Sequence, residues 1–312
     1  MDEDDTLPDA TPDRDYDTMA ELPAGMAPAE RPKVPSTLPP RGACDTHVHM
    51  LGGRGDFRLW DGRPEDPPRD RGFDGWIDLL NTHLTTLEID RVVLVHSVLY
   101  GTDNTVTIEA LKRLGDRARG VGLIGDDATE AHLDRLADAR IKAIRLNHVH
   151  PGVISWEGVK RFAPALAERD MHVEILVNAH EHLASMADDL RALPCPVVLD
   201  HLAWPILGGE GSPEGVETLE RLVGDGDAYT KISGIYRFSD APWDEADDLV
   251  ARLARANPDR LLWGSDWPHI LLGETPMPDA GQLLDAFFRA VEDSETRQKI
   301  LVDTPEQLFG FR

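Results

Sequence analysis

The sequence predicts an α/β fold, a (β/α)8 or TIM barrel over residues 41–312, and three observations support this prediction. Short segments rich in Val, Ile and Leu alternate with segments in which apolar residues recur every three or four positions, as strand-then-helix units do. The alternation gives eight such units, the number that closes a barrel. Residues 1–40, rich in Pro, Asp and Glu, predict an extended or disordered acidic N-terminal segment. Six or seven units would instead suit an open, doubly wound sheet.

The predicted strands are short and apolar, as expected for strands that are covered on both faces. In chain order they are Ala43–His49, Arg91–His96, Arg119–Ile124, Lys142–Asn147, His172–Val177, Pro196–His201, Ala228–Ser233 and Arg260–Asp266. The intervals between them carry amphipathic patterns that predict helices. These helices cover residues 76–87, 104–114, 129–139, 156–169, 181–193, 213–223, 243–256 and 279–291, with a final helix at Thr304–Phe309.

Charge and composition narrow the classes of partner. A formal net charge of −25 argues against nucleic acid and acidic membranes, because both need a positive patch on the protein. The sequence has no apolar run of the about 18 residues that a membrane span needs, and the start MDEDD lacks the order of a secretory signal. Cys44 and Cys195 form no CxxC pair. We expect a cytoplasmic protein that acts on a small molecule. The sequence allows either a monomer or a homo-oligomer.

The first chemical motif is the histidine pair in DTHVHML. His47 and His49 are two residues apart on a predicted strand, so both side chains lie on the same face and can meet one ligand. Surface strands also produce such a pattern. Here the pair lies at the carboxyl end of the first strand, where barrel active sites are found, and this position favours a functional role.

Two further residues are expected at the same end of the barrel. Asp266, in LLWGSDWPH, ends the eighth strand, and His201, in VVLDHLAWP, ends the sixth. Barrel closure places the eighth strand beside the first, so Asp266 should face the histidine pair. Individually, Asp266 could cap a turn and His201 could be a packed core histidine. Together the four residues predict a catalytic or metal-binding cluster.

These motifs resemble those of the amidohydrolase superfamily, in its amidohydrolase-2 branch. The resemblance rests on DTHVH, LDHLAWP, WGSDWPH and the terminal TPEQLFGF, and covers nearly all of the chain after residue 40. HSVLYGTDN and KISGIYR are similar to segments of the 2-pyrone-4,6-dicarboxylate lactonase group, which is related to sugar-acid lactonases, galactarolactone isomerase and sulfomuconolactone hydrolases. The resemblance implies hydrolysis of a small anionic lactone. Members of the branch work without metal or with one zinc ion, so the expected cofactor is none or one divalent metal, zinc first.

The sequence departs from the binuclear members of that superfamily, which carry a bridging lysine late on strand four. Lys142 lies at the beginning of this strand, the wrong end of the barrel, and Arg145 lies near the rim. We therefore expect at most one metal ion, held by His47, His49, His201 and Asp266.

Arg145 and Arg237 are the candidates for binding a substrate carboxylate. The pattern of strand four turns Arg145 inward, and a guanidinium matches a carboxylate with two parallel hydrogen bonds. Arg145 could instead pair with a neighbouring acid. The resemblance assigns Arg237 to substrate binding. Ser97, Asn104 and Tyr236 are expected to add hydrogen bonds, whereas Asp45 and Asp200 are expected to point outward with structural roles.

These residues suggest a mechanism for opening a lactone. Asp266 would act as general base on water, while the three histidines polarise the carbonyl directly or through one metal ion. Three alternatives remain at this point: a lactone isomerase, a zinc-dependent decarboxylase of the same branch, and a catalytically silent barrel that binds a ligand. Loss of turnover in Asp266→Asn would separate the enzymes from the silent barrel.

Overall fold

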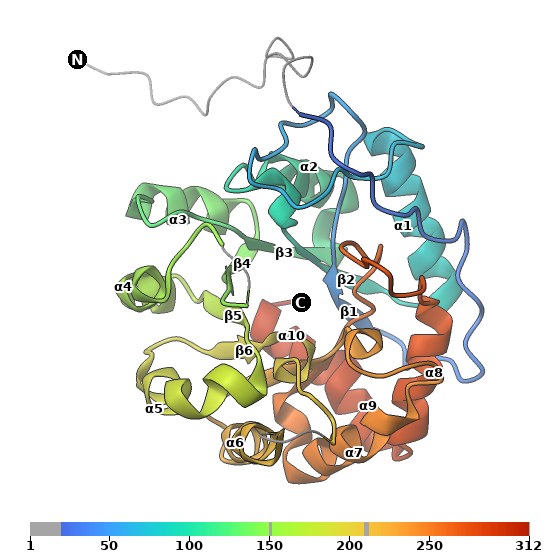
Figure 1. Ribbon diagram of the computed structural model, residues 1–312, viewed down its shortest axis with the longest axis vertical. Helices are drawn as coiled ribbons and strands as arrows, with labels where there is room; N and C mark the ends of the chain where they lie inside the picture. Colours follow the sequence, from blue (N-terminus) through green and yellow to red (C-terminus); the bar gives the residue numbers. More distant parts are fainter. Residues whose placement is uncertain (1–19, 150–151, 209–211, 312) are drawn as a thin grey trace.

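The computed structural model describes residues 20–149, 152–208 and 212–311, and it confirms the TIM barrel. Eight parallel strands pair in chain order around a central axis (Figure 1). They are β1 (Cys44–Val48), β2 (Arg91–Val95), β3 (Ala118–Gly122), β4 (Ile141–Asn147), β5 (His172–Leu176), β6 (Val197–Leu199), β7 (Tyr229–Ile232) and β8 (Leu261–Trp263).

A ring of helices covers the outside of the barrel (Figure 1). They are α1 (Phe73–Leu87), α2 (Thr105–Leu114), α3 (Glu130–Asp138), α4 (Trp156–Ala167), α5 (Ala184–Ala192), α6 (Ser212–Gly224), α7 (Asp247–Ala256) and α8 (Ala280–Ala290), followed by α9 (Ser294–Gln298) and α10 (Thr304–Phe309). In the described part of the chain, none of these helices has the length and apolar character to cross a membrane.

The barrel closes where β1 meets the segment after β8. The amide of Asp266 donates to the His47 carbonyl at 2.9 Å, and the amide of His49 donates to the Trp267 carbonyl at 2.7 Å. The predicted eighth strand extended to Asp266, but β8 ends at Trp263 because the backbone leaves the sheet there and Asp266 adopts φ 63°. The main chain itself therefore fixes the distance between the histidine pair and the carboxylate.

Apolar residues fill the lower half of the barrel interior. Cys44, Val93, Val95, Val121, Ala143, Val198 and Leu262 point inward from the strands and pack with Phe309 and Phe311 at the C-terminal end of the chain. Such a filled interior leaves no channel. The predicted cluster of histidines and Asp266 therefore lies in the upper half, at the carboxyl ends of the strands.

The described part of the N-terminal segment is extended, as expected, and runs along the barrel. The amide of Lys33 donates to Asp279 Oδ2 at 3.0 Å, and the amide of Ser36 donates to Asp285 Oδ1 at 2.7 Å. Ala24 forms an isolated parallel β-bridge with Asp66, whose carbonyl accepts from the Gly25 amide at 2.8 Å. The prediction for residues 1–19 lies outside the described residues.

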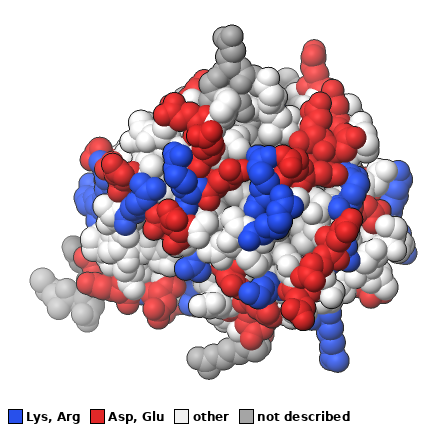
Figure 2. Space-filling view, turned by 90° about the horizontal axis from the view of Figure 1, so that it is seen from below, with Lys and Arg blue, Asp and Glu red and all other residues white. Residues whose placement is uncertain are grey.

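Acidic and basic side chains are mixed on the face that Figure 2 shows. Many exposed side chains of the protein form ion pairs, such as Lys112 Nζ with Glu109 Oε1 at 2.5 Å on α2. In that pair the side chains are 64% and 39% exposed, so water screens the attraction strongly.

Candidate active site

The four residues of the predicted cluster meet at the upper end of the barrel. Asp266 Oδ1 lies 3.4 Å from His49 Nε2 and 3.6 Å from His47 Nε2, and Asp266 Oδ2 lies 4.0 Å from His201 Nε2. All four side chains are buried. The structure thus brings together residues that are up to 219 positions apart in the chain, from 47 to 266.

Two glycines allow this close approach. A Cβ on Gly264, just after β8, would lie 2.6 Å from the Cβ of His47. A Cβ on Gly234, just after β7, would lie 2.6 Å from Nδ1 of His201, and Gly234 also has φ 59°. Neither position leaves room for a side chain, so both glycines are required for the position of the histidine rings.

His201 reaches the site through an unusual turn. β6 ends at Leu199, two residues earlier than predicted, and the residues from His201 to Trp204 have φ values of 54°, 54°, 58° and 43°. A left-handed stretch of non-glycine residues costs about 1–2 kcal/mol per residue, so the surrounding structure must hold it. It swings His201 inward, where its Nδ1 lies 2.8 Å from Ser233 Oγ.

The prediction that Asp200 points outward is wrong. Val198 is part of the packed barrel interior, so alternation turns Asp200 inward as well, and the left-handed turn then adds His201 to the same side. Asp200 Oδ2 accepts from Arg145 Nε at 2.8 Å. Asp45 faces the other way, toward α1, where its Oδ2 lies 3.5 Å from His83 Nε2.

One oxygen of Asp266 is occupied and the other is open. Oδ2 accepts a hydrogen bond from the Tyr236 hydroxyl at 2.7 Å and from Arg237 Nε at 3.0 Å. Burial alone would raise the pKa of Asp266. Arg237 and the nearby histidines lower it by more, so the pKa lies well below its usual value. Among the described residues Oδ1 has no hydrogen-bond partner. An ionised carboxylate therefore presents a free oxygen to whatever enters the site.

The three histidine rings are held in orientations that suit metal ligands or hydrogen-bond donors. His49 Nδ1 lies 2.8 Å from the Val95 carbonyl, which can only accept, so the proton of a neutral His49 is on Nδ1 and the lone pair on Nε2 faces Asp266. Burial lowers the pKa of His201 to about 4 and holds the pKa of His47 well below its ordinary value. Both rings are therefore neutral near pH 7.

These atoms fit one divalent cation. Ligand atoms of His47, His201 and Asp266 lie within 4.8 Å of one another, and His49 adds a lone pair 3.4 Å from the open carboxylate oxygen. His47 Nε2 and Asp266 Oδ1 are both buried without a hydrogen-bond partner among the described residues. Two facing acceptors, His49 Nε2 and Asp266 Oδ1, need a proton or a cation between them. Imidazole and carboxylate ligands suit zinc.

The chain also matches a known protein family. The amidohydrolase family profile matches residues 44–311. The chain belongs to the amidohydrolase family. The resemblance inferred from the motifs is thereby confirmed.

Among curated amidohydrolase relatives, the chain is 31% identical to 4-sulfomuconolactone hydrolase of Rhizobium radiobacter, over 92% of this chain and 97% of the relative. It is 30% identical to 2-pyrone-4,6-dicarboxylate hydrolase of Comamonas testosteroni, over 89% and 93%, and 26% identical to D-galactarolactone isomerase of Agrobacterium fabrum, over 88% and 94%. The relatives thus show that this member of the family is an enzyme.

Solved structures share the barrel. An apo structure of an Agrobacterium tumefaciens protein superposes with a TM-score of 0.80 at 24% identity, covering 91% of this chain and 99% of that one. An amidohydrolase from Burkholderia multivorans with bound Zn has a TM-score of 0.65 at 18% identity, covering 86% and 99%. At these identities the likeness shows the fold alone.

Below the cluster, this amidohydrolase buries a second set of charges; Arg145 pairs with an acid, the alternative left open by the sequence, and Lys231 was not anticipated. Lys231 on β7 donates to Glu174 Oε2 on β5 at 2.5 Å and lies 3.4 Å from Asp200 Oδ1. Arg145 completes the set through Asp200. Lys231 has no exposed surface. A lysine inside the buried strand YTKI was the available signal, because buried strands rarely carry an ammonium without a partner.

The predicted substrate-binding residues divide into two groups. Tyr236 and Arg237 lie at the cluster and contact Asp266, and Arg145 lies below it with only Nε engaged among the described residues. Ser97 and Asn104 instead stabilise loops. Ser97 Oγ accepts from the Leu99 amide at 3.3 Å, and the Asn104 amide exchanges hydrogen bonds with the backbone of Leu123 at 2.7 and 2.9 Å.

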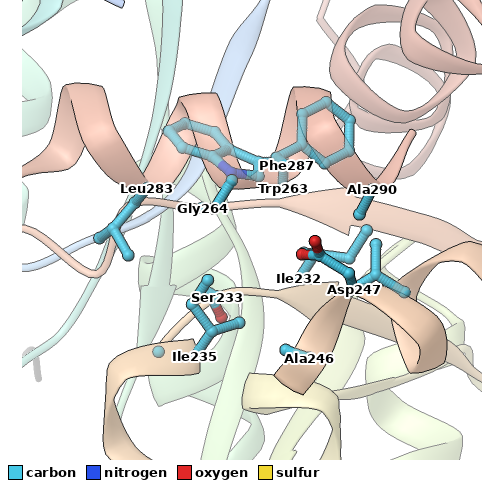
Figure 3. A pocket seen from close by; sticks show the side chains of 13 residues that line it. Ile232, Ser233, Ile235, Ala246, Asp247, Trp263, Gly264, Leu283, Phe287 and Ala290 are labelled. Carbon is cyan, nitrogen blue, oxygen red and sulfur yellow. The ribbon is translucent and has the colours of Figure 1, made fainter. Parts of the chain in front are cut away.

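Two cavities lie near the cluster without containing it. One lies behind Ser233 and Gly264, between the ends of β7 and β8 and the helices outside them (Figure 3). At about 10 Å³ it has room for no more than one water. The other, about 830 Å³, opens at the rim between the loops after β1, β2 and β3, and Trp60 and Tyr100 line it.

Proposed function

We propose that this amidohydrolase opens a small lactone that carries negatively charged groups. The observation that carries the proposal is Asp266: an ionised, buried carboxylate with one oxygen held by Tyr236 and Arg237 and the other open toward His47 and His49. Two relatives with at least 30% identity are named as hydrolases of anionic lactones, a sulfomuconolactone and a pyrone dicarboxylate. A base beside neutral imidazoles suits water attack on an ester carbonyl.

In the proposed reaction, Asp266 Oδ1 holds a water molecule and takes one of its protons as the oxygen attacks the lactone carbonyl carbon. The imidazoles of His47 and His201 stabilise the oxyanion of the tetrahedral intermediate by hydrogen bonding. The intermediate collapses as the ring C–O bond breaks, and Asp266 returns its proton to the leaving oxygen. The product is a hydroxy acid or its keto tautomer.

The arginines are proposed to hold the anionic groups of the substrate. The terminal nitrogens of Arg145 are the first candidates, since its hydrogen bonds to described residues use only Nε. Arg237 is bonded to Asp266 and, through Nη2, to the Ile270 carbonyl at 3.0 Å. If a substrate carboxylate shares this guanidinium, Arg237 stabilises the Asp266 carboxylate less. The pKa of Asp266 then rises and Asp266 becomes a stronger base.

The cofactor is proposed to be none or one divalent ion, zinc first. His47, His49, His201 and Asp266 would hold such an ion, which would polarise the carbonyl and acidify a bound water. The experiment for both questions is one assay. A panel of 2-pyrone-4,6-dicarboxylate, 4-sulfomuconolactone and galactarolactone is offered to the protein, with and without chelator, and acid release is followed with a pH indicator.

We expect acid release from at least one lactone, and we expect Asp266→Asn to lower kcat by about 10²–10⁴-fold while substrate binding is largely retained. Asp259→Asn is the matched control, because Asp259 pairs with Lys299 on the surface. Unchanged turnover in Asp266→Asn would contradict the assignment.

Lactone isomerisation is a second candidate because of the galactarolactone isomerase relative. In that case an attacking hydroxyl of the substrate replaces water. Proton NMR of a galactarolactone mixture would then show one ring form converting into another without net acid release.

A further inference from the structure

Lys231, the buried lysine below the active site, lies among groups that could otherwise bind a metal ion. Ligand atoms of His47, Glu174 and Asp200 lie within 4.8 Å of one another, and the Lys231 ammonium contacts all three, at 3.3, 2.5 and 3.4 Å. Lys231 therefore supplies the positive charge that these two carboxylates need. It also touches a histidine of the active site.

That contact constrains the proton on His47. An ammonium has only hydrogens to offer, so Lys231 Nζ, 3.3 Å from His47 Nδ1, needs the lone pair at that nitrogen. A neutral ring with a lone pair on Nδ1 carries its proton on Nε2. Nε2 is the atom that faces the open oxygen of Asp266 at 3.6 Å.

Asp200 acts in the opposite direction. Its Oδ1 lies 3.3 Å from His47 Nδ1 and would favour a proton there. The contact lacks the alignment of a hydrogen bond, since Asp200 Oδ1 has no hydrogen-bond partner among the described residues. The second oxygen of Asp200 is held by Arg145, which keeps the carboxylate from turning. The lysine contact is thus the one that satisfies hydrogen-bond geometry.

We propose that Lys231 is a positioning residue that keeps the ring proton of His47 on Nε2, so that His47 presents a hydrogen-bond donor to the reacting carbonyl instead of a ligand lone pair. This inference rests on the proposed lactone hydrolysis for its catalytic meaning. It also concerns metal, because an imidazole nitrogen that carries a proton cannot coordinate. Lys231 then disfavours His47 as a ligand and favours the metal-free form of the site.

The test uses the full-length, chelator-treated protein with nitrogen-15 in its histidines. Two-bond proton–nitrogen correlation spectra distinguish a protonated from an unprotonated ring nitrogen, and the signals of His47 are identified by their loss in His47→Asn. In the wild type we expect a protonated Nε2 and an unprotonated Nδ1. An unprotonated Nε2 in the wild type overturns the proposal, and this measurement needs no variant of Lys231.

A charge-balanced variant gives the second arm. Lys231→Met with Glu174→Gln removes one positive and one negative charge together and leaves the Arg145–Asp200 pair in place. We expect the His47 proton to move to Nδ1, toward Asp200, and the affinity for zinc, measured by competition with a chromophoric chelator, to rise about 10-fold or more. Unchanged tautomer and zinc affinity in a folded double variant would overturn the proposal.

Lys142→Met is the matched control, because Lys142 lies at the other end of the barrel, on β4 near Gly310. We expect it to leave the tautomer and the zinc affinity as in the wild type. The two proposals fail separately. If the lactone panel gives no turnover but the spectra show the expected tautomer, the proposed substrate is wrong and the lysine–histidine relation holds.

Discussion

Two lysine–glutamate pairs in this protein have the same length and very different surroundings. Lys112 Nζ and Glu109 Oε1 on α2, and Lys231 Nζ and Glu174 Oε2 inside the barrel, are each 2.5 Å apart. The side chains of the first pair are 64% and 39% exposed, and those of the second are fully buried. Water can replace either partner on α2. Water cannot replace a partner inside the barrel, so the loss of one partner leaves the other charge buried without compensation.

The comparison teaches that distance alone does not rank ion pairs. The buried pair costs desolvation when the protein folds, and its net contribution to stability is small compared with the cost of breaking it. The role of such a buried pair is better understood from the group that it positions. Here that group is the ring of His47, 3.3 Å from Lys231 Nζ.

The largest effect is expected from breaking the buried pair on one side only. Glu174→Gln leaves the Lys231 ammonium without its nearest carboxylate, and we expect the free energy of unfolding to fall by about 3–5 kcal/mol. Urea unfolding followed by circular dichroism measures it. Adding Lys231→Met should recover part of the loss, and no recovery would show that the two residues do not interact energetically.

A second effect follows from His96, a buried histidine directly after β2 whose Nδ1 lies 2.7 Å from Thr107 Oγ1. Burial lowers the pKa of His96 to about 4, against about 6.5 in an unfolded chain. Between these values the unfolded chain binds more protons, so stability falls as the pH is lowered from about 6.5 to 4, by up to about 3 kcal/mol for this group. We expect His96→Gln to flatten the dependence of unfolding free energy on pH in this window. A slope identical to that of the wild type would contradict the burial argument.

A steric change should have an intermediate effect. Gly234→Ala forces a Cβ to within 2.6 Å of His201 Nδ1 at a positive φ, and we expect a loss of about 1–3 kcal/mol in stability. Displacement of the ring should lower turnover about 10²-fold. Gly226→Ala is the control, because Gly226 has a similar φ of 84° but only side-chain atoms at 3.6 Å or more. Equal losses of activity in both variants would exclude a specific effect on His201.

The smallest effect is expected at the exposed pair. Glu109→Gln should change the free energy of unfolding by less than about 1 kcal/mol, and the small difference should vanish in high salt. The same urea experiment measures it beside Glu174→Gln. A loss as large as that of Glu174→Gln would remove the distinction between the two environments.

The fold was accessible from the sequence because each strand and helix carries its own local pattern. All eight strands and the final helix Thr304–Phe309 fall where the pattern predicted them. The ends of β6 and β8 were missed. His201 and Asp266 have positive φ angles, and their tertiary contacts, with Gly234 and with the His47 carbonyl, leave no mark in the hydrophobic pattern.

The convergence of the histidines and Asp266 could also be predicted, because barrel closure alone requires it. The buried charges below the cluster could not be predicted. Asp200 was assigned to the outside because strand alternation was counted from His201, the residue that departs from it. Lys231 was passed over although a charged residue in an apolar strand is itself a signal. In both cases the partner comes from another strand, and a single sequence does not specify the pairing.

The seam between β1 and β8 has a consequence for the newly made chain. His47 lies near the start of the barrel and Asp266 near its end, and a backbone hydrogen bond joins them. A ribosome must therefore add another 219 residues after His47 before Asp266 exists and can contact the imidazoles. Truncated products that end between residues 50 and 265 would carry both histidines of the first strand without Asp266, so the proposed base would be missing from them.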